Sequence, residues 1–172
     1  HEGEAGLVSS MPDPFTPTVF VVDDDPSVRT AVKRLLASVG LPCETFSTAA
    51  EFLARSEGGV SGCLVLDVRM PGASGLDLQR MLNHAGTDLP IIFVTAHADV
   101  PLTVRAMKAG ALEVLTKPFD DQALLDAVYQ ALEQERVRSH DREELHRLRD
   151  RFETLTARER EVQHRADFVK GL

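Results

Sequence analysis

The sequence predicts an α/β protein with a doubly wound, parallel sheet of five strands, followed by a long C-terminal linker helix. Apolar runs of strand length alternate along the chain with segments whose apolar residues repeat at helical spacing. Two of these runs, 19–22 and 64–66, are apolar at every position, which is typical of parallel strands buried on both faces. Five strands that alternate with five helices place helices on both faces of one sheet.

Five segments are predicted as strands because they combine apolar and β-branched residues over a short run. Turn-forming residues separate them from the segments between. In chain order they are TVFVV (18–22), PCETF (42–46), CLVLDV (63–68), IIFVTA (91–96) and LEVLT (112–116).

Helical patterns lie between the strands. Segment 26–39 carries apolar residues that share one helical face: Val28, Ala31, Val32, Leu35, Leu36 and Val39. Thr48 and Glu51 have the spacing of a capping box at the start of the next helix.

Two later helices also have defined starts. Asp99 can cap a helix that has Pro101 in its first turn and Gly110 at its end. Asp120 or Asp121 opens the last helix. We expect this helix to bury Leu124, Leu125 and Val128.

Composition narrows the class of protein. No apolar run approaches the ~20 residues that span a membrane, and no segment resembles a secretory signal. Cys43 and Cys63 lie in apolar runs without metal-ligand spacing, which favours buried thiols in a reducing, cytoplasmic setting. Acidic side chains outnumber basic ones in residues 18–133, so this part is unsuited to binding nucleic acid.

The chain divides into parts of different character. Residues 1–17 are interpreted as a tag or disordered tail, and residues 18–133 as one globular domain. Residues 134–153 are dense in charge of both signs, which suits a solvated linker helix.

Polar side chains follow four of the predicted strands. Asp23 and Asp24 come after the first strand, Asp67 after the third, Thr95 after the fourth and Lys117 after the fifth. Because ligands bind outside the carboxyl ends of the strands in such sheets, we expect these side chains to share one rim.

Three carboxylates at one place repel each other unless a cation compensates them. Clustered oxygen ligands suit a hard cation, and Mg²⁺ fits this requirement. A carboxylate beside Mg²⁺ can attack a phosphoryl group in line, while Lys117 and Thr95 interact with the transferring oxygens. Asp25, the remaining carboxylate of the acidic run, is interpreted as a helix cap.

Five motifs contain or flank these residues: VVDDDPSVR (21–29), LVLDVRMPGASG (64–75), IIFVTAHAD (91–99), AMKAGA (106–111) and LTKPF (115–119). Through them residues 18–133 resemble the response-regulator receiver domains of two-component signalling, which have a flavodoxin-like (βα)5 fold. The resemblance implies that Asp67 accepts a phosphoryl group from the phosphohistidine of a sensor histidine kinase.

The resemblance also implies a ligand set for Mg²⁺. Asp24, Asp67 and the backbone carbonyl of Arg69 would bind the ion directly, and Asp23 would act through a metal-bound water. Thr95 and Lys117 would hold the phosphoryl oxygens.

Two backbone and side-chain details follow from the same resemblance. The Lys117–Pro118 peptide bond is expected to be cis. Receivers often carry an aromatic residue three positions before the lysine, but this chain has Val114 there. We therefore expect movement of the loop after Thr95 without an aromatic partner.

The C-terminal part contains a heptad pattern. Leu145, Leu148, Phe152 and Leu155 keep the 3-4-3 spacing of a heptad seam. Toward the N-terminus the same register meets polar residues at 141, 138 and 134. Two interpretations stay open: a solvated connector helix, or a helix that dimerises or docks.

The stretch LTAREREV (155–162) resembles the opening of a LuxR-type helix-turn-helix output domain, as in nitrogen-fixation-type regulators. Residues 154–172 are therefore interpreted as the start of such a domain. We expect it to be incomplete, because too few residues follow Val162 to form a recognition helix.

The resemblance thus implies a cytoplasmic transcriptional regulator that is controlled by phosphorylation and binds promoter DNA through its output domain. Phosphorylation is expected to switch either dimerisation or the release of that output domain. The protein is not predicted to be an enzyme beyond self-phosphorylation and slow autodephosphorylation. One alternative is a receiver that acts as an adaptor or dimerisation module without DNA output. Another is a haloacid-dehalogenase-type phosphatase with Asp23 as nucleophile, which leaves the motifs around Asp67 and Lys117 unexplained.

Overall fold

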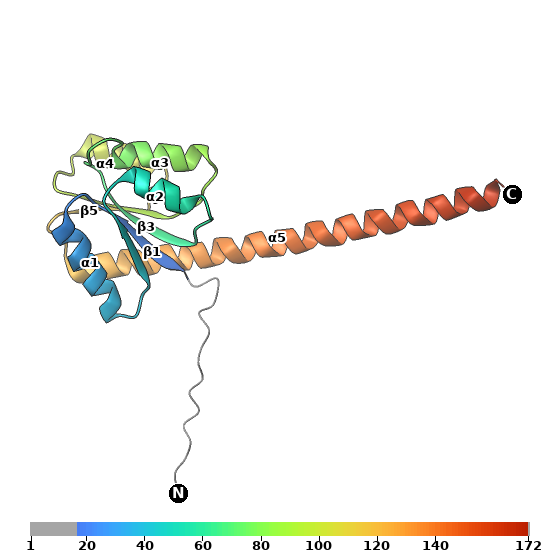
Figure 1. Ribbon diagram of the computed structural model, residues 1–172, viewed down its shortest axis with the longest axis horizontal. Coiled ribbons are helices and arrows are strands. Elements are labelled where there is room, and N and C mark those ends of the chain that lie inside the picture. Colours follow the sequence, from blue (N-terminus) through green and yellow to red (C-terminus); the bar gives the residue numbers. More distant parts are fainter. Residues whose placement is uncertain (1–16, 172) are drawn as a thin grey trace, which may run out of the picture. The chain divides into compact units, whose positions relative to one another are not determined.

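The computed structural model describes residues 17–171, and in this part of the chain five strands alternate with five helices (Figure 1). The predicted tail lies outside the described residues, apart from residue 17. The elements in chain order are β1 (Thr18–Val22), α1 (Pro26–Ser38), β2 (Cys43–Phe46), α2 (Ala49–Ser56), β3 (Gly62–Asp67), α3 (Gly75–His84), β4 (Ile91–Thr95), α4 (Val100–Lys108), β5 (Glu113–Thr116) and α5 (Asp121–Lys170). All five predicted strands are confirmed, and each end lies within one residue of its predicted position.

The strands form one parallel sheet in the order β2-β1-β3-β4-β5. The predicted doubly wound architecture is therefore confirmed. The chain places β2 on one side of β1 and β3 on the other, so the strand order changes direction beside β1. Val22 pairs with Leu66, and Asp23 and Asp67 therefore leave neighbouring strands at the same level.

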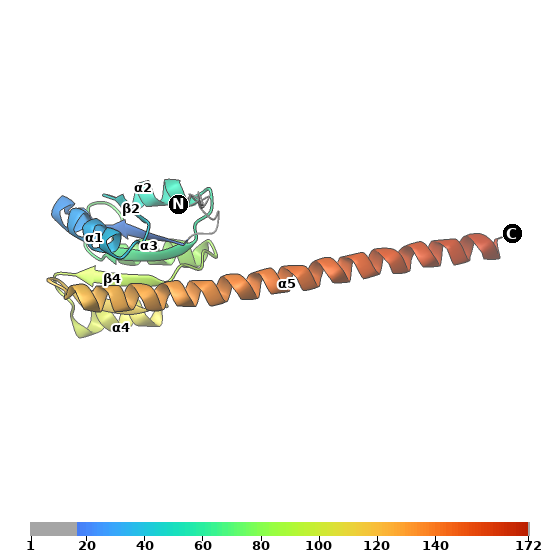
Figure 2. The ribbon, with the colours of Figure 1, turned by 90° about the horizontal axis from the view of Figure 1, so that it is seen from below.

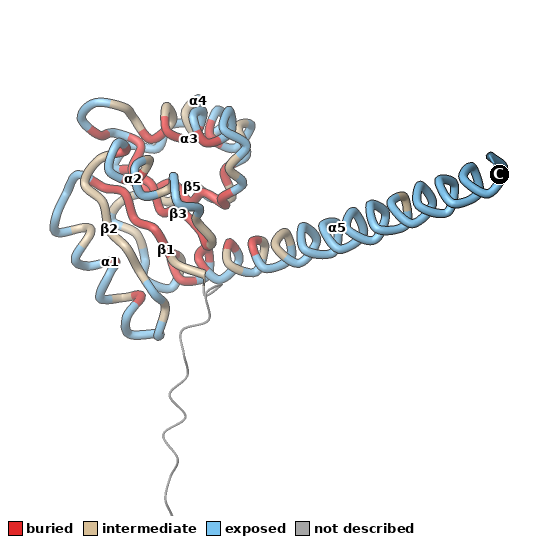
Figure 3. Tube along the Cα trace, turned by 45° about the vertical axis from the view of Figure 1, so that its right-hand side comes forward, coloured by how far each residue is buried: buried red, intermediate tan, exposed pale blue. Residues whose placement is uncertain are grey.

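The sheet lies between two hydrophobic cores, one on each face. Alternate strand residues supply them: Phe20 and Val22 belong to one core, and Val19 and Val21 to the other. Helices α2, α3 and α4 cover the first face, while α1 and the first turns of α5 cover the second (Figures 1 and 2). Colouring by burial shows the central strands as the most enclosed part of the domain (Figure 3).

Side-chain caps fix the starts of α1 and α4 as predicted. The Asp25 carboxylate accepts a hydrogen bond from the Ser27 amide at 2.9 Å, and the Asp99 carboxylate accepts one from the Leu102 amide at 2.8 Å. The apolar face of α1 is narrower than predicted. Val32 and Leu36 are buried, whereas Ala31 and Val39 are exposed.

The predicted capping box of α2 is only half formed. The Thr48 hydroxyl accepts from the Glu51 amide at 3.2 Å. The Glu51 carboxylate, however, accepts from the amide of Ser47, one residue before the cap. A complete capping box instead begins α3, between Ser74 and Asp77.

Both cysteines are free thiols. Cys63 is buried, and burial raises its pKa to about 12. Cys43 is half-buried, and the same effect raises its pKa to about 11. Both thiols therefore stay protonated at neutral pH.

Helix α5 continues without a break for 50 residues. Its first turns bury Leu124, Leu125 and Val128, as predicted. The chain forms two compact units, one ending at Glu135 and the other beginning at Arg136. The proposed linker (134–153) and the LTAREREV stretch both lie within α5. Within residues 17–171, no helix has both the length and the apolar character needed to cross a membrane.

Gly75 starts α3 against the backbone of β3. Its amide donates a hydrogen bond to the Val68 carbonyl at 2.9 Å. A methyl group at this position would overlap the carbonyl oxygen of Asp67. Glycine is therefore required here by close approach, and the contact ties α3 to the end of the strand that carries Asp67.

We predict that Gly75→Ala lowers the free energy of unfolding by about 1–3 kcal/mol, because the added methyl group forces the backbone of Asp67 to move. Urea denaturation measures this change. Gly58→Ala is the matched control, since a methyl group there meets open space, and it should stay within about 0.5 kcal/mol of the parent. Equal unfolding midpoints for Gly75→Ala and the parent would contradict the close contact.

Candidate functional site

Three carboxylates meet at the carboxyl ends of β1 and β3. Asp23 and Asp24 directly follow β1, and Asp67 is the last residue of β3. One carboxylate oxygen from each residue lies within 4.8 Å of those of the other two. Asp23 and Asp67 are buried, whereas Asp24 is exposed. The parallel register of the two strands is what brings the carboxylates together.

Lys117 supplies a positive charge at this cluster. Its Nζ donates a hydrogen bond to Asp23 Oδ2 at 2.7 Å and lies 3.5 Å from Asp67 Oδ2. The backbone holds the residue in place, because the Lys117 amide donates to the Thr95 carbonyl at 2.7 Å. The Lys117–Pro118 peptide bond is cis, as the resemblance implied.

Asp23 is fully engaged by the protein. Its Oδ1 accepts a hydrogen bond from the Asp25 amide at 2.9 Å, while its Oδ2 accepts from Lys117. Its backbone carbonyl accepts from the Arg29 guanidinium at 2.7 Å. A carboxylate held on both oxygens is poorly placed to attack a substrate, which argues against Asp23 as the nucleophile of a phosphatase.

Asp67 is held more loosely. Its Oδ1 accepts a long hydrogen bond, 3.3 Å, from the Arg69 amide. Burial raises the pKa of its carboxyl to about 6, the Asp23 carboxylate adds to the increase, and Lys117 opposes it. Asp67 is only 5% exposed, so its charge at neutral pH is kept in a poorly solvated place.

The charges of the cluster do not balance. Burial lowers the pKa of the Lys117 ammonium, but the hydrogen bond and charge of Asp23, together with Asp67, outweigh burial and raise it above its ordinary value. Lys117 is therefore protonated at neutral pH, yet one ammonium faces three carboxylates. Asp24 forms no hydrogen bond or ion pair with any residue in 17–171. Two buried carboxylates and a free exposed one fit the donor set of a hard divalent cation.

Thr95 ends β4 next to this cluster in the sheet. It is buried, and its hydroxyl accepts a long hydrogen bond, 3.4 Å, from the His97 amide. Val114 lies in β5 and is partly buried against the core that contains Phe93. Its side chain can form no hydrogen bond, so the hydroxyl of Thr95 has no polar partner at that position.

Two supporting residues escaped sequence analysis. Arg29 binds the Asp23 carbonyl from the first turns of α1, and Gly75 allows α3 to approach Asp67. Arg29 lies one helical turn after Pro26, and this spacing could have indicated its contact with the Asp23 carbonyl. Gly75 directly follows the capping residue Ser74, and a glycine at the first position of a helix could have indicated a close backbone approach.

Known proteins resemble this chain in sequence and in fold. The family described as the response regulator receiver domain matches residues 19–129. Nodulation protein W of Bradyrhizobium diazoefficiens is 50% identical over 144 residues, which cover 84% of this chain and 63% of that protein. Response regulator protein TodT of Pseudomonas putida is 42% identical over 144 residues, with the same two shares. The chain thus spans less than two thirds of the length of these relatives.

Solved structures agree with the sequence matches. The response regulator StyR superposes with a TM-score of 0.75 at 52% identity, over 78% of this chain and 68% of that one. The structure of FixJ-N superposes with a TM-score of 0.64 at 39% identity, over 72% of this chain and 96% of that one. Fold, motifs and relatives lead to one conclusion: this chain belongs to the response regulator receiver domain family.

Proposed function

We propose that this protein is a cytoplasmic, phosphorylation-dependent response regulator whose Asp67 accepts a phosphoryl group from the phosphohistidine of a sensor histidine kinase. The observation that carries the proposal is that the protein engages the carboxylate oxygens of Asp23 fully but those of Asp67 only loosely. Lys117 and the Asp25 amide occupy both oxygens of Asp23. Asp67 keeps an oxygen 3.5 Å from the Lys117 ammonium and has a pKa raised to about 6.

The transfer itself needs little covalent chemistry from the protein. An oxygen of Asp67 attacks phosphorus, the P–N bond of the phosphohistidine breaks, and its electron pair stays on the imidazole nitrogen. The product is an acyl phosphate on Asp67. Lys117 would balance the charge on the phosphoryl oxygens, and the hydroxyl of Thr95 would donate a hydrogen bond to one of them. We propose no enzymatic activity beyond this self-phosphorylation and a slow loss of the phosphate.

Mg²⁺ is the cofactor that the cluster would hold. Asp24, Asp67 and the backbone carbonyl of Arg69 would bind it directly, and Asp23 would act through a water because its own oxygens are already engaged. When bound, Mg²⁺ compensates the excess of carboxylate charge and stabilises charge on the phosphoryl oxygens. The unpaired carboxylate of Asp24 supports this role.

The regulated step is proposed to be dimerisation through α4 and β5. Thr95 is a buried polar group at the start of the loop that leads into α4. A hydrogen bond from its hydroxyl to a phosphoryl oxygen would pull this loop toward Asp67. Helix α4 exposes large apolar side chains that such a movement could present to a second receiver, namely Val100, Val104 and Met107.

Transcriptional output is the proposed end of the pathway, through promoter DNA and an output domain of the LuxR type. The relatives support it, since they include proteins named as transcriptional regulatory proteins. An adaptor or dimerisation module without DNA output is the second candidate. It is favoured by α5, which takes up residues 154–170 as a continuation of one helix. The division into linker and output segments stays a prediction.

Asp67→Asn is expected to abolish phosphate incorporation from acetyl phosphate and Mg²⁺, because an amide cannot form the acyl phosphate. The fold should persist, since the two side chains are nearly isosteric. Intact mass and peptide mapping of the parent and the variant measure the outcome. Asp77→Asn, at an aspartate outside the cluster, should incorporate phosphate like the parent. Modification of Asp23 in the parent would refute the assignment.

Asp24→Ala is expected to remove most of the stabilisation by Mg²⁺ in thermal melts, because a directly bound ligand is lost. Asp25→Ala is the control: it loses a helix cap, worth about 1 kcal/mol, but should keep the Mg²⁺-induced increase in the parent's melting temperature. The increase in the parent should shrink as pH falls from 7 to 5, since Asp67, with a pKa of about 6, becomes protonated and cannot bind metal. An unchanged Mg²⁺ response in Asp24→Ala would remove Asp24 from the ligands.

Thr95→Ala should separate phosphorylation from dimerisation. In a chain that ends at Glu135, where the first unit ends, phosphorylation of the parent should tighten dimerisation by about tenfold or more. The variant should still be modified on Asp67 but should show no such change, because it has lost the hydroxyl that binds the phosphoryl oxygen. Thr95→Ser restores the hydroxyl and should restore the response. Sedimentation with and without acetyl phosphate measures all three, and a full response in Thr95→Ala would contradict the coupling.

A further inference from the structure

We propose that residues 145–169 of α5 form a parallel, two-stranded coiled coil with a second copy of this chain. The heptad seam does not stop at Leu155, because α5 continues unbroken to Lys170. Counted on in the same register, the positions that follow are Glu159, Val162, Ala166 and Val169. We call the whole set the tail seam: Leu145, Leu148, Phe152, Leu155, Glu159, Val162, Ala166 and Val169. It spans more than three heptads, and one of its members, Glu159, is polar.

The side chains of the tail seam are exposed to solvent in the single chain. Its large apolar members are between 52% and 72% exposed, and no side chain between Arg136 and Gly171 is buried. Isolated helices gain little stability in water, and helical segments in proteins are held mainly by packing of an apolar face. A partner helix would supply the packing that the described residues do not.

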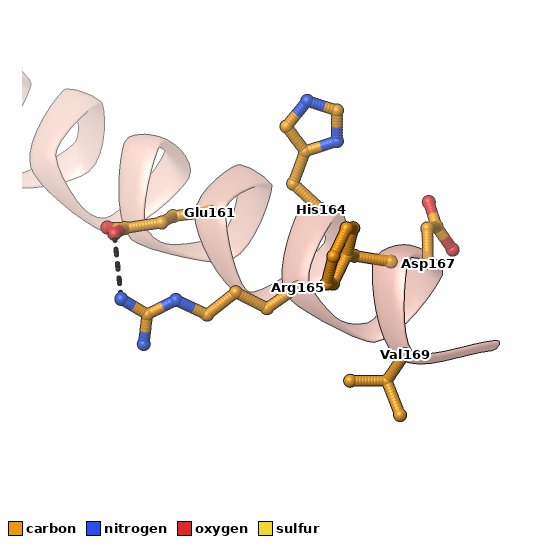
Figure 4. A pocket seen from close by; sticks show the side chains of 6 residues that line it. Glu161, His164, Arg165, Asp167 and Val169 are labelled. Atoms are coloured by element: carbon orange, nitrogen blue, oxygen red, sulfur yellow. Dashed lines mark hydrogen bonds and ion pairs between the residues drawn. The ribbon is translucent and has the colours of Figure 1, made fainter. Parts of the chain in front are cut away.

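The last turns of α5 carry polar and apolar side chains beside the tail seam (Figure 4). The Arg165 guanidinium lies 3.4 Å from the Glu161 carboxylate, which forms an ion pair between successive turns of the helix. Among the side chains drawn there, only Val169 belongs to the tail seam, and Phe168 lies outside it.

Charges beside the seam distinguish the two orientations of a second copy. In a parallel, in-register pair, Glu144 lies opposite Arg149 of the second copy, which is an attractive pair, and Arg165 lies opposite Lys170, which is a like-charge pair. In the antiparallel arrangement with the same core layers, Glu144 would face Arg165, but Arg151 would face Arg158 and Arg149 would face Lys170. The antiparallel form therefore has one more kind of like-charge contact, which favours the parallel form.

Glu159 is the polar residue within the seam, and the parallel arrangement compensates it. In a parallel coiled coil, a residue at the position of Glu159 packs between four residues of the facing helix. One of these four directly precedes the equivalent residue, Glu159, in the second copy. For Glu159 that residue is Arg158 of the second copy. The two Glu159 side chains meet in one core layer, and their contacts with Arg158 offset part of the repulsion between them. A polar layer of this kind costs stability.

This coiled coil is independent of the proposed phosphorylation. No member of the tail seam lies in the receiver unit, which ends at Glu135. Two receivers joined in this way would face each other at high effective concentration. Phosphorylation would then act on receivers that are already paired through their tails.

The first test compares two phenylalanines of α5. Phe152 and Phe168 are both 72% exposed, but only Phe152 belongs to the tail seam. In sedimentation of the full chain without phosphodonor, we expect the parent to dimerise and Phe152→Ser to weaken the dimer by tenfold or more. Phe168→Ser should match the parent. A parent that stays monomeric throughout the concentration series, or equal losses in both variants, would overturn the proposal. Phosphate uptake by Phe152→Ser is measured in parallel, so failure of the coiled coil is distinguishable from failure of the phosphoacceptor assignment.

The second test examines register and orientation. Arg158→Glu and Arg160→Glu change the net charge equally, but only Arg158 faces Glu159 of the second copy. We expect Arg158→Glu to weaken the dimer by tenfold or more and Arg160→Glu to leave it within twofold. Under oxidation, the thiol introduced by Leu148→Cys should cross-link to its own counterpart, because identical positions meet in a parallel pair. Equal effects of the two arginine changes, or a cross-link only to another position, would overturn the parallel arrangement.

Discussion

Carboxylate repulsion at the ends of β1 and β3 is the constraint around which this receiver is organised. Two buried carboxylates and an exposed third have oxygens within 4.8 Å of one another, and a single ammonium offsets them. Such an arrangement costs stability wherever it is not compensated. The Lys117 ion pair and the amide donors to Asp23 and Asp67 offset part of this repulsion. The parallel register of the two strands holds these carboxylates at one level.

The sheet is stiff because both of its faces are covered. Phe20 and Val22 pack under α2, α3 and α4, whereas Val19 and Val21 pack under α1 and α5. The strand bearing Asp67 is therefore clamped from both sides, and Gly75 brings α3 against its last peptide. Closely packed layers of this kind resist gradual deformation, so a change at Asp67 would be accommodated in the loops that follow the strands.

Much of this could be read from the sequence, for identifiable physical reasons. The sequence predicts the strands because buried parallel strands are apolar at successive positions. It predicts the site residues because polar side chains directly follow these apolar runs, at the carboxyl ends of the strands. Local hydrogen bonding was harder to predict. Glu51 accepts from Ser47 and not from Thr48, because a carboxylate at this spacing can reach either amide. Helix α3 had no defined ends in the sequence, since its cap Ser74 lies within a glycine-rich loop that allows several starts.

The tail shows a different kind of gap between sequence and structure. LTAREREV indicates an output domain by resemblance, but a helical pattern alone does not reveal whether a helix belongs to a globular domain or continues an existing one. No helix-breaking residue separates Asp121 from Lys170, and α5 runs through the whole stretch. The site roles of Thr95 and Arg69 likewise rest on resemblance, because their interactions with a phosphoryl group or a metal depend on partners that the chain does not contain.

The position of β5 at the edge of the sheet has a consequence for handling this protein. An edge strand offers unpaired backbone groups to other chains, and charged side chains are the usual protection against such pairing. β5 is four residues long, begins at the exposed Glu113 and is followed directly by Lys117. The Lys117 ammonium is held in the carboxylate cluster, so Glu113 is the charged side chain that protects this edge. A loss of function in a Glu113 variant should therefore be interpreted only after its solubility has been compared with that of the parent.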